Sequence, residues 1–204
     1  MIQTPIHYLV TGVIAGCILT LLTIMITTPE TKGENELITD YYSIENAVSV
    51  SPHGLRAQMS KGQTDHYVLV DLRSQEEYEK EHVVTAVNIP TYKDANTSAY
   101  GEVDRIVDSF KTLIEENPDK DIITYCYSTA CMTSRKIGLI LAEHDIHVKH
   151  LNIGWNEWKY AWDSWNHDSE TPVNPEDYVV QGKEPGTPPK NDLAPICTDG
   201  EFGC

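Results

Sequence analysis

The chain has 204 residues, of which 40% are hydrophobic, so it suits one ordinary domain with appendages. Its formal net charge of −16 argues against nucleic-acid binding, which needs a basic surface. The same acidity disfavours docking on anionic lipid headgroups.

The amino-terminal segment, residues 1–29, carries no Asp, Glu, Lys or Arg, and residues 8–26 are mainly apolar. A helix of that length crosses a hydrocarbon core of ~30 Å. A cleaved signal peptide is the alternative, but a basic region before the apolar run is missing. The stretch "IAGC" resembles a lipoprotein cleavage box, yet more apolar sequence follows Cys17. We therefore expect an uncleaved, single-pass anchor in a cell membrane, with Cys17 as a lipid-facing or buried thiol.

The orientation of this anchor is indicated only weakly, because no Lys or Arg precedes the apolar run. Residues 30–40 hold four acidic residues against one lysine. We expect the amino terminus inside and the following domain outside the cytoplasm.

Residues 30–41 are polar and predict a juxtamembrane linker, and residues 42–166 then alternate between strand and helix patterns. Such alternation predicts a parallel sheet covered by helices on both faces. The expected strands are 46–50, 66–73, 86–90, 121–126 and 148–153. The expected helices are 51–62, 74–82, 101–118, 134–144 and 155–165.

The last segment, residues 167–204, is rich in proline and acidic residues and predicts a solvated, extended tail. It contains Cys197 and Cys204, separated by a short stretch with two glycines. Outside the cytoplasm these cysteines could form a disulfide. Idle thiols or thiols that carry redox equivalents are equally compatible with the sequence.

Cys126 ends an apolar strand pattern, and the next helix is expected to begin near Ser134. In open α/β sheets, ligands bind beyond the carboxyl ends of the strands. A loop there can direct backbone N–H groups toward an anion, and such surroundings lower the pKa of a thiol. We therefore expect Cys126 to be the most nucleophilic thiol of the globular part. A buried structural cysteine is the alternative.

Two stretches carry a resemblance to a known family: "VLVDLRSQEEYEKEHVVTAVNIP" (68–90) and "IITYC" with "SRKIGLILAEHDIHVKHLNIGWNEW" (122–126 and 134–158). Over roughly residues 42–165 the chain resembles the rhodanese family. The resemblance implies a doubly wound α/β domain and a cysteine that takes up sulfane sulfur as a persulfide, cradled by loop amides. Cys126 occupies that position. The substrate-binding residues that this implies are Tyr127, Ser128, Thr129, Ala130, Met132 and Arg135.

The chain departs from the family pattern at several positions. The family often has glycine where this chain has Glu81 and Thr85. Its loop usually contains a glycine and an Arg or Lys about five residues after the cysteine, where this chain has Cys131. The loop is also about two residues longer, and Arg135 lies further along the chain. The missing loop arginine disfavours the cysteine phosphatases and arsenate reductases of similar fold.

Cys131 has two interpretations. A metal clip would need further ligands, and closing so short a loop with a disulfide adds little stability. As a resolving thiol, Cys131 would attack a persulfide on Cys126, release sulfide and leave a disulfide. Alternatively, Cys131 only fills the space of the family's arginine.

The remaining candidates have structural interpretations. Asp71 and Arg73 end the central strand pattern and are expected to form a structural ion pair near the site. His82 is expected to fix a turn. His144, His147 and His150 span a helix end and a strand, so they should not converge on a metal. Four tryptophans in residues 155–165 indicate packing on one helix face. We expect no metal and no cofactor.

Together these features predict a membrane-anchored sulfurtransferase or thiol-redox protein that works through a persulfide or disulfide at Cys126. Its partners would be a small sulfane-sulfur donor or a thiol acceptor, and not a nucleic acid. The alternative is a catalytically inactive rhodanese fold that serves as a binding or regulatory module.

Overall fold

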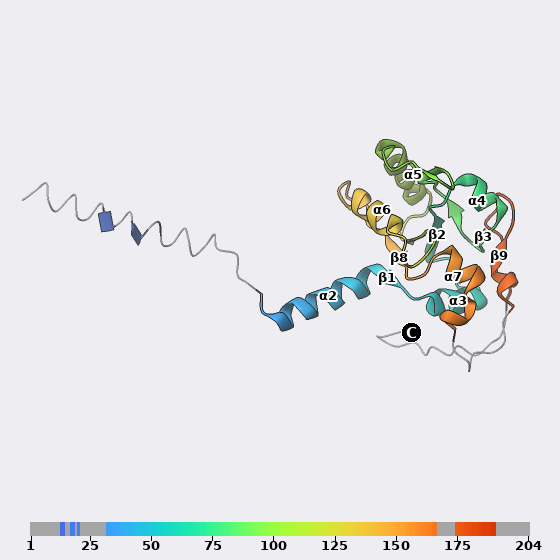
Figure 1. The fold of residues 1–204 in the computed structure, drawn as a ribbon, viewed down its shortest axis with the longest axis horizontal. Coiled ribbons are helices and arrows are strands. Elements are labelled where there is room, and N and C mark those ends of the chain that lie inside the picture. Colours follow the sequence, from blue (N-terminus) through green and yellow to red (C-terminus); the bar gives the residue numbers. More distant parts are fainter. Residues whose placement is uncertain (1–12, 15–16, 19, 21–31, 167–173, 191–204) are drawn as a thin grey trace, which may run out of the picture. The chain divides into compact units, whose positions relative to one another are not determined.

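The structure is a computed structural model that describes residues 13–14, 17–18, 20, 32–166 and 174–190 (Figure 1). It divides into two units, Met1–Ser43 and Ile44–Cys204. Among the described residues, no helix is both long and apolar enough to cross a membrane. The anchor expected at residues 8–26 lies mostly outside the described residues, as do Cys197 and Cys204.

Helix α2 (Glu34–Val48) replaces most of the linker expected at 30–41 and most of the strand expected at 46–50. Two glutamates in its first turn favour helix formation, because they face the positive end of the helix dipole. Lys32 forms an ion pair with Asp40. None of the helix's residues is buried, so it owes its form to local interactions. The strand after it, β1 (Ser49–Val50), has only two residues.

The second unit is built on a five-stranded parallel sheet with the strand order β1-β8-β7-β2-β4. The two central strands pair over five residues each, from Tyr67↔Asp121 to Asp71↔Tyr125. This confirms the predicted parallel α/β sheet. Besides β1, its strands are β2 (Tyr67–Asp71), β4 (Val87–Asn88), β7 (Asp121–Tyr125) and β8 (Lys149–Leu151).

Helices cover both faces of the sheet, which is the doubly wound arrangement (Figure 1). Helices α3 (Pro52–Ser60) and α7 (Trp155–Tyr160) contribute to one apolar cluster. Helices α5 (Val103–Glu116) and α6 (Thr133–Ala142) contribute to the other. Because side chains alternate along a strand, Tyr67 and Leu69 of β2 enter the first cluster and Val68 and Val70 the second.

Several helix starts follow from local sequence. Ser51 caps α3, with Pro52 as its first residue, and Ser74 caps the short helix α4 (Gln75–Lys80). In α5 the helical spacing of apolar residues places Ile106, Val107 and Phe110 in the core, as predicted.

Two features were not predicted. Strand β3 (His82–Val83) lies outside the main sheet, and β5 (Tyr92–Asp94) forms a hairpin with β6 (Thr97–Ser98).

The helix expected at 155–165 ends at Tyr160, and a short 3-10 helix, η1 (Trp162–Ser164), follows it. The tryptophans still pack together, since the Trp158 and Trp165 rings stack with centroids 5.2 Å apart.

The solvated tail expected from residue 167 is wrong for residues 174–190. This segment contains the 3-10 helix η2 (Pro175–Tyr178) and strand β9 (Val179–Val180), which pairs antiparallel with β3. Tyr178 is buried in the first core cluster. Composition indicated a polar chain here, but a buried ring, a short strand pairing and backbone hydrogen bonds such as that from the Thr85 N–H to the Pro185 carbonyl hold it against the domain.

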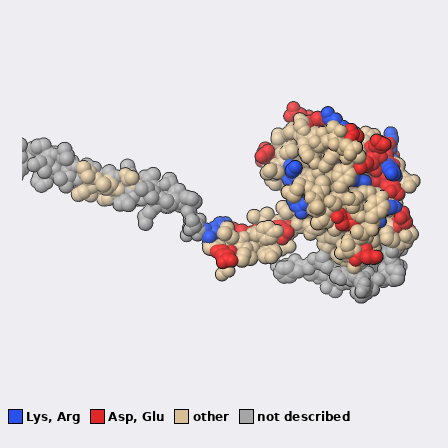
Figure 2. Space-filling view, in the orientation of Figure 1, with Lys and Arg blue, Asp and Glu red and all other residues tan. Residues whose placement is uncertain are grey.

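The charged side chains on the face shown in Figure 2 are interspersed, with Asp and Glu beside Lys and Arg. No continuous basic area is visible on this face. Such a surface lacks the clustered positive charge that a nucleic-acid backbone attracts.

Candidate active site

The sequence-predicted loop, residues 126–132, connects β7 to α6 at the carboxyl end of the central strands. Side chains alternate between the two faces of a sheet, and this decides which face the side chain of Cys126 enters. Tyr125 enters the first core cluster, and Cys126 therefore enters the second. The Cys126 side chain lies among apolar residues that include Leu72 and Ile137, and only 3% of Cys126 is exposed.

Burial raises the pKa of the Cys126 thiol well above its ordinary value, and Cys131 adds to this effect. The expectation of a thiolate at Cys126 conflicts with this burial. It assumed that the loop amides and the helix N-terminus dominate, whereas loss of hydration in the apolar cluster is the larger effect.

Cys131 has a different environment, because it is half-buried and stands two residues before the helix-starting Thr133. Its Sγ lies 3.1 Å from the Thr133 hydroxyl. Burial acts to raise the pKa of Cys131, but hydrogen bonds from the hydroxyl and backbone N–H of Thr133, from Cys126 and from the Tyr127 backbone together lower it. The two cysteines are thus close enough to affect each other's pKa, which burial raises at Cys126 and hydrogen bonding lowers at Cys131.

Two tyrosines complete the surroundings of Cys131. The Thr133 hydroxyl lies 2.6 Å from the Tyr100 hydroxyl and 2.9 Å from the Tyr92 hydroxyl, and the two tyrosine hydroxyls are 2.8 Å apart. The Tyr92 ring also meets the Tyr127 ring edge-on. Sequence analysis missed Tyr92 and Tyr100, because they lie more than thirty residues from Thr133 and only the β5–β6 region brings them to the loop.

The start of α7 holds the loop from the other side. The N–H groups of Trp155 and Asn156 each donate at 2.8 Å to loop carbonyls, those of Cys126 and Tyr127. These donors are among the first N–H groups of a helix, which have no partner within it. The quoted "GWNEW" stretch therefore supports the cysteine loop directly.

The Glu157 carboxylate accepts a hydrogen bond from one of the backbone N–H groups of the loop. Its Oε2 accepts hydrogen bonds from the backbone N–H of Gly154 at 2.9 Å and of Thr129 at 3.2 Å. A loop N–H that was expected to bind a substrate anion is therefore bonded to a carboxylate of the chain. Glu157 was not predicted as a site residue, and no local sequence signal links it to residue 129.

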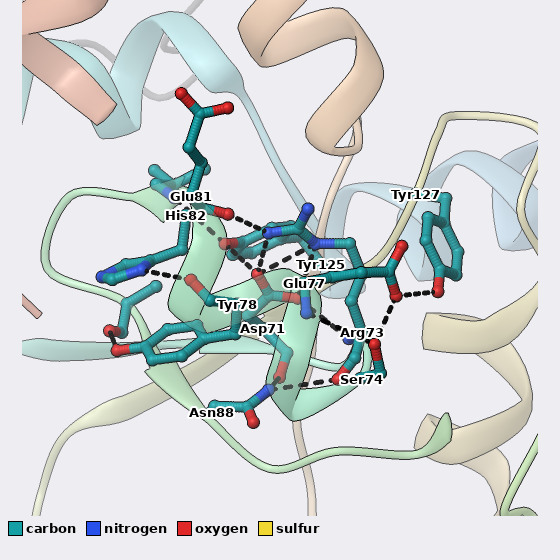
Figure 3. Close-up of polar contacts among 12 residues, drawn as sticks. Asp71, Arg73, Ser74, Glu77, Tyr78, Glu81, His82, Asn88, Tyr125 and Tyr127 are labelled. Carbon is teal, nitrogen blue, oxygen red and sulfur yellow. Dashed lines mark hydrogen bonds and ion pairs between the residues drawn. The ribbon is translucent and has the colours of Figure 1, made fainter. Parts of the chain in front are cut away.

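The other predicted substrate-binding residues have varied positions. Thr129, Ala130, Met132 and Arg135 are exposed, and Ser128 is half-buried. The Arg135 guanidinium donates to the Thr129 carbonyl at 3.4 Å. Tyr127 is half-buried, and its hydroxyl donates to Glu77, which also accepts from Ser74 (Figure 3). The exposed side chains in the middle of the loop are therefore accessible to solvent. At the start of the loop, the carbonyls of Cys126 and Tyr127 are held by hydrogen bonds.

Asp71 and Arg73 form a buried ion pair beside the loop, with Arg73 Nη2 at 2.6 Å from Asp71 Oδ2 (Figure 3). The Tyr125 hydroxyl donates to the same carboxylate at 2.6 Å. Arg73 also donates to the Glu81 carbonyl and lies over the Trp155 ring, 4.3 Å from its centroid. The pair thus links the ends of β2 and β7 to the first residue of α7.

His82, His144 and His150 lie outside the cysteine loop. The two ring nitrogens of His82 face the carbonyls of Tyr78 at 2.8 Å and Glu184 at 3.1 Å, so His82 connects α4 to the carboxyl-terminal segment. His144 bonds to the Ile140 carbonyl, while His150 belongs to β8. Within the described part of the chain, no group of three His, Cys, Asp or Glu residues could hold a metal ion.

A family model for the rhodanese-like domain matches residues 51–161, from the start of α3 to the end of α7. The chain belongs to the rhodanese-like domain family. This confirms the family indicated by the sequence, and it is consistent with a sulfurtransferase or related function.

Individual rhodanese-like relatives are distant. An HTH-type transcriptional regulator of Mycobacterium tuberculosis is 31% identical over 93 residues, which are 46% of this chain and 34% of that protein. The chain therefore matches about a third of that relative's length. A protein of Bacillus halodurans has 27% identity over 63% of this chain and 82% of its own, with a TM-score of 0.48. A rhodanese with anions from E. coli has 20% identity over 56% and 96%, with a TM-score of 0.33.

Proposed function

We propose that the Cys126–Cys131 pair transfers sulfane sulfur or exchanges thiols with a small donor, through a persulfide or disulfide. The observation that carries the proposal is the presence of two thiols in one loop at the carboxyl end of the central strands, where each alters the pKa of the other. A thiolate is the nucleophile in such exchange, and one member of the pair has a lowered pKa.

In the proposed reaction, the attacking thiolate takes the outer sulfur of a donor R–S–SH, and R–SH leaves. The attacked cysteine then carries the persulfide. Attack by the second cysteine on the inner sulfur forms the Cys126–Cys131 disulfide and releases HS⁻. A dithiol reductant then reduces the disulfide, so that both thiols are restored and the electrons balance.

Mass spectrometry of the full chain tests this proposal after exposure to a low-molecular-weight persulfide without reductant. We expect a peptide spanning both cysteines to gain about 32 Da, the mass of one sulfur atom, or to lose two hydrogens as a disulfide. The variant with serine at both positions is the control for reaction at Cys17. A wild-type chain that shows neither product would contradict the proposal.

The second candidate is a catalytically inactive binding or regulatory module. Two observations favour it: Cys126 is closed off in the core, and Glu157 already occupies the Thr129 N–H. The Mycobacterium tuberculosis relative is named a transcriptional regulator, which is a statement about that protein alone. A chain that takes up no sulfur and forms no disulfide would favour this candidate.

We further propose that residues 8–26 anchor the protein in a cell membrane, with the domain outside the cytoplasm. The support is the mainly apolar, charge-free sequence and its acidic flank. Protease added to intact spheroplasts should remove the domain. Full protection of the domain, with cleavage after lysis, would reverse the orientation.

A further inference from the structure

The resemblance to rhodaneses implies that Cys126 takes up sulfur, and the sequence interpretation made Cys131 the resolving thiol. The contacts around the two thiols support the opposite order. We infer that Cys131 makes the first attack on the donor, that Thr133, Tyr92 and Tyr100 position its thiolate, and that Cys126 is the buried resolving thiol. This inference rests on the proposed sulfur-transfer function.

Access is the first argument. Cys131 is half-buried and lies between Ala130 and Met132, which are both exposed. Cys126 is 3% exposed and lies in the apolar cluster between the sheet and helices α5 and α6. A donor in solution can therefore approach Cys131, whereas it reaches Cys126 only after the loop or the cluster moves.

The direction of the hydroxyl contacts is the second argument. The Thr133 hydroxyl has a single proton and lies within hydrogen-bond distance of Cys131, Tyr92 and Tyr100. If Thr133 donates to a thiolate, which only accepts, the tyrosine hydroxyls can both donate toward Thr133. This arrangement satisfies the thiolate and stabilises its charge. A neutral thiol is a weak donor and gains less from the same hydroxyls.

The titratable surroundings of Cys131 come from several elements. The Lys136 ammonium lies 5.7 Å from the centroid of the Tyr100 ring. Glu77 is held by the Tyr127 hydroxyl. The titratable groups of the loop and of the elements that contact it are Cys126 after β7, Tyr92 in β5, Tyr100 before α5, Tyr127 in the loop, Glu77 in α4, and Arg135 and Lys136 in α6.

The high pKa of Cys126 then has a use in the second step. The Cys131 thiolate attacks the outer sulfur of R–S–SH, R–SH leaves with the proton, and Cys131–S–S⁻ remains. The Cys126 proton next passes to the terminal sulfur of this persulfide, and the resulting Cys126 thiolate attacks Cys131 Sγ, so that the disulfide forms and HS⁻ leaves. A thiol that keeps its proton until this point supplies the proton that the leaving group needs.

The first experiment measures alkylation rates of both cysteines by pulse labelling of the full chain with iodoacetamide from pH 5 to 10. Cys131 should be labelled at least about tenfold faster than Cys126 at neutral pH, the scale of one charge-assisted hydrogen bond. Thr133→Val should slow labelling of Cys131 by about tenfold and move its midpoint to higher pH, with a smaller effect from Tyr100→Phe. Thr112→Val, the same change on the exposed surface of α5, is the control and should change neither rate.

The second experiment locates the sulfur in single variants. After treatment with a low-molecular-weight persulfide, Cys126→Ser should retain sulfur on Cys131 and accumulate it, whereas Cys131→Ser should take up little. The reverse pattern, or faster labelling of Cys126, would overturn the assigned order. If no variant takes up sulfur, the proposed function fails. The alkylation rates then still decide which thiol is the nucleophile.

Discussion

A Cβ atom on Gly154 would lie 2.2 Å from the backbone nitrogen of Ser128. Contact this close to backbone cannot be relieved by a side-chain rotation, so glycine is required where α7 meets the cysteine loop. The neighbouring N–H groups of Trp155 and Asn156 hold the same loop through its carbonyls. The position of both thiols therefore depends on a residue that has no side chain.

Gly154→Ala should displace the loop or α7 and lower the unfolding free energy by about 2 kcal/mol or more. Sulfur uptake by the cysteine pair should fall together with stability, as measured by urea unfolding and by mass spectrometry. Gly138→Ala on α6 is the matched control, because its Cβ would meet only Val148 Cγ2 at 3.8 Å. That change should be neutral or stabilising by about 1 kcal/mol. Equal effects at the two positions would contradict the close-contact argument.

Thr85 adopts a backbone φ of 73°, which is unfavourable for a β-branched residue. Glu81 has a φ of −163°, ordinary extended backbone, although the family often has glycine at both positions. Thr85→Gly should therefore raise the unfolding free energy by about 1 kcal/mol. Glu81→Gly should lower it by about 1 kcal/mol, since it adds chain entropy and removes the contact with Lys159. Urea denaturation of both variants checks the opposite signs.

The lowered pKa of His82 predicts how the free energy of unfolding depends on pH. Burial is the largest influence and lowers the pKa of His82 below its ordinary value of 6.5. Below pH 6.5 the unfolded chain binds a proton that the folded chain does not bind, so unfolding becomes more favourable as the pH falls toward the folded pKa. Burial also lowers the pKa of His150, with the same sign.

We expect His82→Gln to lower stability at neutral pH but to flatten its decline between pH 6.5 and 5.5, by up to about 1.4 kcal/mol per pH unit. Thermal unfolding across this range measures the slope. Parallel curves for the variant and the wild type would show that His82 does not contribute.

Tyr178 anchors the carboxyl-terminal segment, since 1% of it is exposed and its carbonyl accepts from Trp158 Nε1 and the Val84 N–H. Tyr178→Ala should lower the unfolding free energy by about 3–5 kcal/mol and open the segment to protease. Tyr160→Ala is the matched control, because Tyr160 is 71% exposed. Its effect should stay within about 0.5 kcal/mol. Tolerance of Tyr178→Ala would mean that residues 174–190 are not part of the folded unit.

Local sequence was sufficient for the central elements of this protein. Ser51 before Pro52 predicted the start of α3, and the apolar runs predicted β2 and β7. Local sequence patterns did not predict α2, which has no stripe of buried residues facing the core. They also did not predict β3 and β9, which are too short to show a periodic pattern. Such short strands form only because a partner from elsewhere in the chain supplies the hydrogen bonds.

The sequence by itself determined the family, the order of the central strands and the helices between them, and the position of Cys126 at the end of a central strand, with Cys131 in the loop that follows. These properties depend on neighbours along the chain, through periodicity, caps and linked motifs. Only the tertiary structure decided how burial and hydrogen bonding differ between the two thiols. Burial of Cys126 depends on α5 and α6, the hydroxyls near Cys131 depend on Tyr92 and Tyr100, and the loop's shape depends on Gly154 and Glu157. Hydration and hydrogen bonding set a pKa, and both are fixed by residues that are distant in sequence.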